Sequence, residues 1–67
     1  MPLSIAIRSR RKRHKLTQHA LATLIGYTGR NPGAAISRIE LGVQVPKLET
    51  LGKIARVLKT TVGKLME

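Results

Sequence analysis

The sequence predicts an all-α domain of five short helices, and three observations lead to this prediction. Apolar residues recur at three- and four-residue spacing in several separate stretches, which is the pattern of helices with one buried face. Glycine, proline and hydroxyl residues stand between those stretches, where helices begin and end. The chain has 67 residues, the length of one small domain with a thin core, so residues 1–67 are expected to fold as a single unit.

The first expected helix runs from about residue 3 to residue 14 and is basic on its outer face. Its inner face is formed by residues at three- and four-residue spacing, among them the aliphatic stems of two arginines: Leu3, Ile7, Arg10 and Arg11. Pro2 or Ser4 can start this helix. One face is therefore expected to cover the core, and the other to carry cations.

The second expected helix runs from about Gln18 to Ile25. Thr17 is its expected N-cap, because a threonine hydroxyl can accept a hydrogen bond from a free amide of the first turn. Gly26 is expected to end the helix in the left-handed conformation. The predicted buried stripe is Leu21, Leu24 and Ile25, and Ala22 keeps one face of the helix small.

Turn formers fill residues 27–31, and the third expected helix follows from Pro32 to Leu41. Asn31 is its expected N-cap, with Pro32 at the first helical position. The residues expected to face inward are Ile36 and Ile39, and those left on the outer surface or at the leading end are Ala34, Ala35, Ser37 and Arg38.

Gly42 is expected to end the third helix, and Pro46 to open a fourth after a short connection. The apolar residues of the fourth helix recur at helical spacing: Leu48, Leu51, Ile54, Ala55 and Leu58. Thr60 or Thr61 can cap a last short helix. The apolar residues of that helix are Val62, Leu65 and Met66, which are expected to lie in the core, with a dimer surface as the alternative.

The chain is strongly basic, with 13 lysine and arginine residues, three acids and a formal charge of +10. Such a charge points to nucleic acid, an acidic protein or a membrane surface as the partner. Tyr27 is the only aromatic residue, so the stacking surfaces that bind single-stranded nucleic acid have almost no material here. Duplex DNA is therefore the favoured partner. The basic run at residues 8–15 is interpreted as a patch that follows phosphates, with a solvated face and a nuclear-import-like peptide as the alternatives.

Several classes of protein are disfavoured by what the sequence lacks. Cysteine is absent, and His14 and His19 fall on different expected helices with no aspartate in the chain, so neither a metal nor a cofactor is expected. No nucleophile and base are paired near the three carboxylates, so an enzyme is not expected. No apolar stretch approaches the roughly 18 residues of a membrane span, and no signal segment is recognised. A cytoplasmic location is expected, without a membrane partner.

The residues that mark helix ends and helix cores form three ordered motifs. They are Leu16-Thr17-Gln18-x-x-Leu21-Ala22-x-x-x-Gly26, Ile36-Ser37-x-Ile39-Glu40-x-Gly42-x-x-x-Pro46 and Leu51-x-x-Ile54-Ala55-x-x-Leu58. In these motifs, and from about residue 3 to residue 65, the chain resembles the Xre/Cro group of lambda-repressor-like helix-turn-helix DNA-binding domains. The resemblance implies a compact five-helix fold in which the second and third helices form the helix-turn-helix.

The resemblance also implies roles for individual residues. Gln18 matches the position that touches the DNA backbone and orients the recognition helix, whereas Gly33, Ala34 and Arg38 match positions that meet base edges. Gln18 has an amide that, with nearby free backbone amides, can hold one phosphate.

The resemblance also implies one ion pair, and the chain differs from the family pattern in two places. Arg11 and Glu40 match a pair that bridges the first helix to the recognition helix. Glu40 stands among apolar residues of the third helix, where a carboxylate needs a partner of opposite charge. Ile36 lies ten positions after Gly26, where the family has a spacing of about six, so the turn is longer. Arg10 occupies a position that is usually apolar, so it is expected either to extend past the core into water or to point at the DNA backbone.

The chemistry of these side chains indicates how DNA would be bound. Arg38 can donate to O6 and N7 of guanine together, a contact that discriminates by about 1–3 kcal/mol. The alternatives are a phosphate contact and a solvated surface arginine. Gly33 and Ala34 carry no side-chain donor. Sequence preference is therefore expected to depend on DNA shape and on four side chains: Arg30, Asn31, Ser37 and Arg38. Phosphate contacts are expected from Gln18, Arg10 and Lys12.

The leading hypothesis is a sequence-specific regulator of transcription that binds duplex DNA, of prokaryotic or phage type. Repression by covering a promoter and a homodimer on a near-palindromic operator are what the resemblance implies. One alternative is the antitoxin of a toxin–antitoxin pair, which would bind both operator DNA and a protein toxin. Another is a non-specific nucleoid or membrane-surface binder that is held by charge alone, whose binding would collapse with salt and show no sequence preference.

Overall fold

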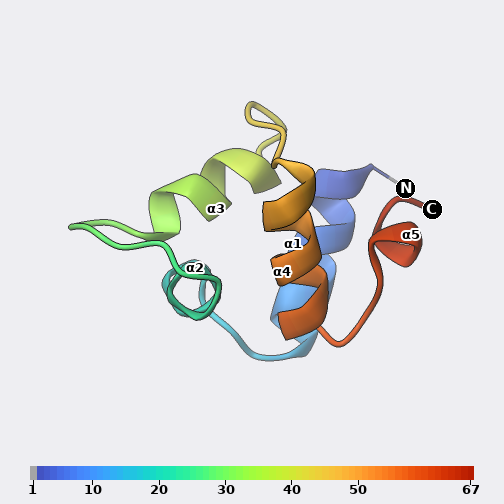
Figure 1. Cartoon of the computed structure of the whole chain (residues 1–67), viewed down its shortest axis with the longest axis horizontal. Helices are drawn as coiled ribbons and strands as arrows, with labels where there is room; N and C mark the ends of the chain where they lie inside the picture. The colour runs from blue at the N-terminus through green and yellow to red at the C-terminus, as the bar shows by residue number, and fades with distance from the viewer. Residues whose placement is uncertain (1) are drawn as a thin grey trace.

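Five helices make up the computed structural model, which describes residues 2–67 (Figure 1). In chain order they are α1 (Leu3–Arg13), α2 (Gln18–Leu24), α3 (Gly33–Glu40), α4 (Leu48–Val57) and α5 (Val62–Leu65). No strand occurs among the described residues. The predicted all-α fold of five helices is therefore confirmed.

One core joins all five helices. Its largest fully buried side chains are Ile7, Leu21, Ile36, Ile39, Ile54, Leu58 and Leu65. The longest helix has 11 residues and the shortest four, so none of them would be stable in water by itself. Burial of these aliphatic side chains against one another is what holds the short helices in place.

The helices α1 to α4 end in the same backbone arrangement, which turns the chain sharply. At the end of α3, the Gly42 amide donates to the Ile39 carbonyl and the Val43 amide donates to the Arg38 carbonyl, both at 3.1 Å. This pattern requires a left-handed residue between the two amides, and Gly42 has a φ of 79°. The corresponding left-handed residues of α1, α2 and α4 are Lys15, Gly26 and Lys59.

Two helices are capped by threonine, and one expected cap is wrong. Thr17 Oγ1 accepts from the Ala20 amide at the start of α2, and Thr61 Oγ1 accepts from the Lys64 amide at the start of α5. Asn31 does not cap α3, because Pro32 is the N-cap residue and no side chain bonds to the free amides there. Pro32 has helical dihedral angles already, so the Asn31 backbone carbonyl, not its side chain, accepts from the helix.

Four predictions of burial are wrong, and one of them concerns Met66, which was expected in the core but is 61% exposed just after the end of α5. Leu24 is 60% exposed. Around the axis of α2, Ala22 and Leu24 lie on opposite sides of Leu21, and the core covers the side with Ala22. Ala35 is buried, because it shares a helix face with Ile39 four residues later. Leu48 is 74% exposed at the first position of α4, which begins two residues after Pro46.

The last helix belongs mainly to the core. Leu65 is fully buried, Val62 packs against the core, and Met66 is 61% exposed. A dimer surface made of all three residues is therefore not available. No helix formed by residues 2–67 is long and apolar enough to cross a membrane.

Candidate nucleic-acid interface

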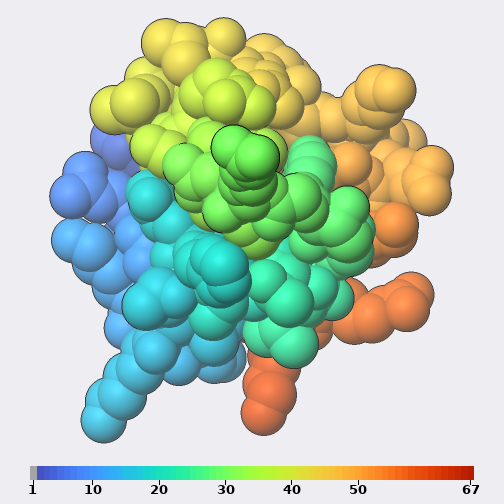
Figure 2. Space-filling model, turned by 90° about the vertical axis from the view of Figure 1, so that its left-hand side faces the viewer, coloured from blue at the N-terminus to red at the C-terminus, as the bar shows by residue number. Residues whose placement is uncertain are grey.

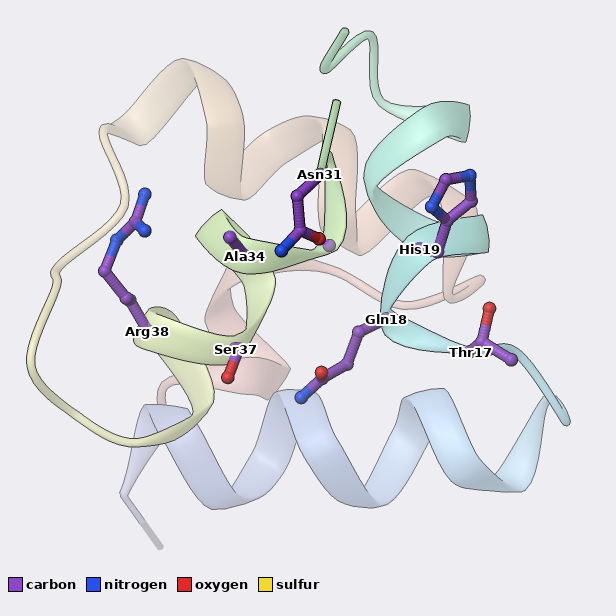
Figure 3. Close-up of a pocket in the computed structure, with 8 residues that line it drawn as sticks. Thr17, Gln18, His19, Asn31, Ala34, Ser37 and Arg38 are labelled. Atoms are coloured by element: carbon purple, nitrogen blue, oxygen red, sulfur yellow. The ribbon is translucent and has the colours of Figure 1, made fainter. Parts of the chain in front are cut away.

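An open depression lies between the start of α2 and the outer face of α3 (Figure 3). Its volume is about 530 Å³, and it is lined by Thr17, Gln18, His19, Asn31, Gly33, Ala34, Ser37 and Arg38. The labelled side chains in Figure 3 come from two separate helix starts and one helix face, and most of them are hydrogen-bonding residues. The depression is therefore open, polar and built by two helices rather than by one loop.

Gly33 sets how closely α2 and α3 approach each other. It is buried, and a Cβ atom at this position would lie 3.0 Å from the His19 nitrogen and 3.2 Å from the His19 Cα. These are backbone atoms of α2, which cannot rotate away as a side chain would. The absence of a side chain at Gly33 thus allows the first turn of α3 to rest directly on the first turn of α2.

A second, smaller depression continues the first toward α1. Its volume is about 180 Å³, and it is lined by Arg8, Arg11, Gln18, Ser37, Glu40 and Leu41. Gln18 and Ser37 line both depressions. The surface therefore runs without interruption from Arg8 on α1, past the start of α2, to the outer face of α3.

An ion pair beneath this surface connects three helices. Arg11 Nε donates to Glu40 Oε2 at 2.6 Å, and Arg11 Nη2 donates to Glu40 Oε1 at 3.0 Å. Arg11 Nη1 also donates to the Leu16 carbonyl at 2.7 Å, just before α2. Gln18 Nε2 donates to Glu40 Oε1 at 3.2 Å, which holds the Gln18 amide at the junction of the two depressions. The second N–H of that amide remains available for a ligand.

The electrostatics of the surface favour an anion. Glu40 is the only carboxylate among the lining residues, and Arg11 neutralises it through two hydrogen bonds. Glu49, another carboxylate, lines neither depression and lies on α4, where its Oε1 is 3.8 Å from Lys53 Nζ. Arg8 and Arg38 flank the surface at its two ends with exposed side chains.

A family model described as Helix-turn-helix matches residues 7–65 of the chain. The chain belongs to the lambda-repressor-like helix-turn-helix family. This is a DNA-binding family, and α2 and α3 are the two consecutive helices that correspond to its helix-turn-helix motif, whose second helix is called the recognition helix. No curated protein matches the chain significantly.

Solved structures of one enzyme are similar to this helix-turn-helix domain. The structure named hydroxypropylphosphonic acid epoxidase from S. wedmorenis aligns with a TM-score of 0.80 and 32% identity, covering 97% of this chain and 32% of the epoxidase chain. Apo-HppE aligns with a TM-score of 0.81 and 32% identity, covering 97% of this chain and 34% of the other. The chain described here thus spans about a third of the length of the enzyme chains that it matches.

The helix-turn-helix geometry brings together most of the residues predicted to bind DNA. The residues that line the main depression and were predicted to contact DNA are Gln18, Asn31, Gly33, Ala34, Ser37 and Arg38. Gly33 is buried against α2, so only a small part of its backbone is exposed at this surface. Lys12 is exposed and shares a face of α1 with Arg8, four residues earlier.

Arg10 does not lie on this surface. A helix turns by about 200° between residues two apart, so Arg10 and Arg8 point to nearly opposite flanks of α1. Arg10 is half-buried, and His14, four residues later on the same flank, has Nε2 2.9 Å from the Leu58 carbonyl at the end of α4. Arg10 lines neither depression and is half-buried, which agrees with the expectation that it extends past the core rather than with the alternative that it points at the DNA backbone.

Four residues of this surface have no DNA-contacting role of their own in the prediction from sequence. Thr17 is predicted only as a helix cap and Arg8 only as part of the basic run, whereas His19 and Leu41 have no predicted place on the surface. The spacing of three between Arg8 and Arg11 was a usable signal, because the buried arginine marks the side of α1 that faces α3. His19 was detectable as the neighbour of Gln18 in the first turn of α2.

The long turn between the two helices of the motif projects from the domain. It forms the left-hand end of the molecule in Figure 1 and, in green, the front of the view in Figure 2. Tyr27 packs against the core at its start, and Pro32 is buried at its end. Arg30 is exposed between them and makes no hydrogen bond or ion pair with the described residues. The turn thus offers one cation next to the start of the recognition helix.

Proposed function

We propose that this domain binds duplex DNA sequence-specifically through α3, as a regulator of transcription that represses by covering a promoter. This proposal rests on the continuous surface that runs from Arg8 past Gln18 and Ser37 to Arg38. The only carboxylate among the residues that line this surface, that of Glu40, is paired with Arg11. Helix α3 enters the major groove in this arrangement, and the start of α2 lies against the DNA backbone.

Phosphates and bases are contacted by different parts of this surface. Arg8, Lys12 and the free N–H of Gln18 bind phosphates and set the position of the domain on the duplex. Arg38 and Ser37 face base edges from the recognition helix, and Arg38 donates to guanine. Ala34 has only a methyl group to offer, which suits a thymine methyl.

Selection from a randomised duplex library at near-physiological salt tests this function. Enrichment of a near-palindromic motif with a guanine in each half-site, and half-sites about 34–36 Å apart, supports binding of a homodimer to an operator. A reporter gene placed behind the enriched site should then be repressed by the protein. Absence of any enriched sequence would contradict specific binding.

A charge-driven, non-specific DNA binder is the second candidate, because the recognition helix has few side-chain donors. Gly33 and Ala35 are buried, and the side chain of Ala34 has no polar atom. At and just before α3, the hydrogen-bonding side chains that line the main depression are therefore Asn31, Ser37 and Arg38. This candidate predicts equal affinity for all duplexes and a steep fall with salt.

Arg38→Ala and Lys12→Ala are expected to weaken DNA binding in different ways. Arg38→Ala should reduce the preference for the selected site by about 1–3 kcal/mol, because the guanine contact is lost. Lys12→Ala should weaken binding equally for selected and unrelated duplexes, because a phosphate contact carries no sequence information. Fluorescence anisotropy with both duplexes measures the two effects. Identical behaviour of the two variants would contradict this division of roles.

Arg30→Ala is expected to lower the salt dependence of DNA binding. If the projecting turn places Arg30 on a phosphate, its loss should reduce the slope of log affinity against log salt by about one. Arg56→Ala is the matched control, because Arg56 is an exposed arginine on α4 that lines neither depression. Equal slopes for the two variants would show that the long turn stays away from the duplex.

A further inference from the structure

The connection after the recognition helix brings Gln44 back against that helix. The left-handed turn at Gly42 reverses the chain, and Gln44 follows two residues later. The Gln44 side chain is half-buried in a depression of about 190 Å³, lined by Leu3, Ser4, Ile39, Gly42, Gln44, Val45 and Pro46. Its amide oxygen accepts a hydrogen bond of 2.8 Å from Arg38 Nε. A residue outside α3 therefore holds the guanidinium of its exposed arginine.

This hydrogen bond limits how Arg38 can bind a base. A guanidinium has five N–H groups and can present two forks, one formed by Nε with an Nη and one formed by both Nη atoms. Gln44 occupies Nε, and neither Nη of Arg38 has a partner among the described residues. Only the fork of the two Nη atoms is left for a pair of acceptors such as O6 and N7 of guanine.

We infer that Gln44 is a positioning residue that sets the base preference of the recognition helix by holding Arg38. The inference rests on the proposed function and adds a specificity determinant that lies outside α3. The bond restrains a long, flexible side chain before DNA arrives, so less conformational freedom is lost when the guanine edge is bound. A restrained fork also fits adenine poorly, because adenine offers N7 beside a donor rather than a second acceptor.

Two substitutions separate the amide acceptor from the bulk of the side chain. Gln44→Met keeps the length and burial of the side chain and removes the acceptor, whereas Gln44→Glu keeps an acceptor oxygen. The main readout is the ratio of affinities for the selected duplex and for the same duplex with guanine changed to adenine. This ratio cancels the general effect of an added negative charge on DNA affinity. Thermal melting of each variant checks that the fold is retained.

The expected result is a fall of the affinity ratio by about five- to tenfold in Gln44→Met and its recovery in Gln44→Glu. In the Arg38→Ala background, Gln44→Met should change the ratio no further. The NMR signal of the Arg38 Nε–H group in the free protein should indicate greater mobility in Gln44→Met and wild-type mobility in Gln44→Glu.

Three outcomes would overturn the inference. An unchanged Nε–H signal in Gln44→Met would show that the hydrogen bond does not restrain Arg38. An unchanged ratio in Gln44→Met, with a wild-type ratio well above one, would overturn the specificity role alone. Failure of Gln44→Glu to restore the ratio would show that Gln44 contacts DNA itself. A wild-type ratio of one would instead reject the proposed function, and the specificity role with it.

Discussion

Arg11→Ala is expected to destabilise the domain by about 3–5 kcal/mol, because it leaves a buried carboxylate without its counter-charge. The Glu40 side chain is only 3% exposed and accepts two hydrogen bonds from Arg11. The Leu16 carbonyl would lose its donor as well. A domain of this size has a total stability of roughly 3–5 kcal/mol, so much of the variant should be unfolded at 25 °C. Urea denaturation followed by circular dichroism measures the change in the free energy of unfolding.

Lys53→Ala is the matched control for that prediction. Lys53 also loses a carboxylate partner, Glu49, but both side chains are mostly exposed and their charged atoms are 3.8 Å apart. The change in the free energy of unfolding should stay within about 0.5 kcal/mol, since water solvates both charges. If the two substitutions destabilised the domain equally, burial would not be the source of the cost.

A double replacement separates stability from function in the same network. Replacing Arg11 and Glu40 together by methionine removes both charges and keeps the volume, and buried pairs exchanged in this way are often replaced at little cost. Gln18 would nevertheless lose the acceptor that orients its amide. We therefore expect this variant to fold and to bind DNA more weakly than the wild-type protein.

Gly33→Ala is expected to destabilise the domain by about 1–3 kcal/mol and to weaken DNA binding, because the new methyl group overpacks the contact between α2 and α3. The added Cβ would lie 3.0 Å from the backbone nitrogen of His19. The two helices of the motif must then move apart, which displaces Gln18 relative to Ser37. Thermal denaturation and anisotropy measured on the same sample report both effects.

Gly52→Ala serves as the control for Gly33→Ala. Gly52 lies inside α4, and a Cβ there would meet no atom within 4 Å. Alanine is the better helix former, so this variant should be more stable by about 0.5–1 kcal/mol and bind DNA unchanged. Destabilisation by both substitutions would show that tight packing at Gly33 is not the cause.

Local patterns were sufficient to predict the helices and most of the core. The spacing of Ile36 and Ile39, and of Ile54 and Leu58, identifies buried faces because a helix repeats every 3.6 residues. Spacing failed for Leu24, which recurs three residues after Leu21 as a core residue would. Periodicity defines a stripe on a helix, but only the neighbouring helices decide which edge of that stripe they cover.

The candidate site was predictable where one helix carries it and not where several helices meet. Ser37 and Arg38 follow from the position of α3, whereas Arg8 and His19 join the surface only because α1 and α2 pack beside it. The Asn31 cap failed for a related reason, since Pro32 already holds helical dihedral angles when the long turn reaches α3.

The sequence by itself determined the all-α fold, the helix-turn-helix family and the basic character of the chain, because these depend on residue order and charge alone. Only the tertiary structure decided that Gly33 is a contact between two backbones, that Arg10 faces away from the candidate interface, and that Gln44 holds Arg38. The physical reason is the same in each case. Directions of side chains and approaches between helices are set by packing among residues distant in the chain, which no local pattern records.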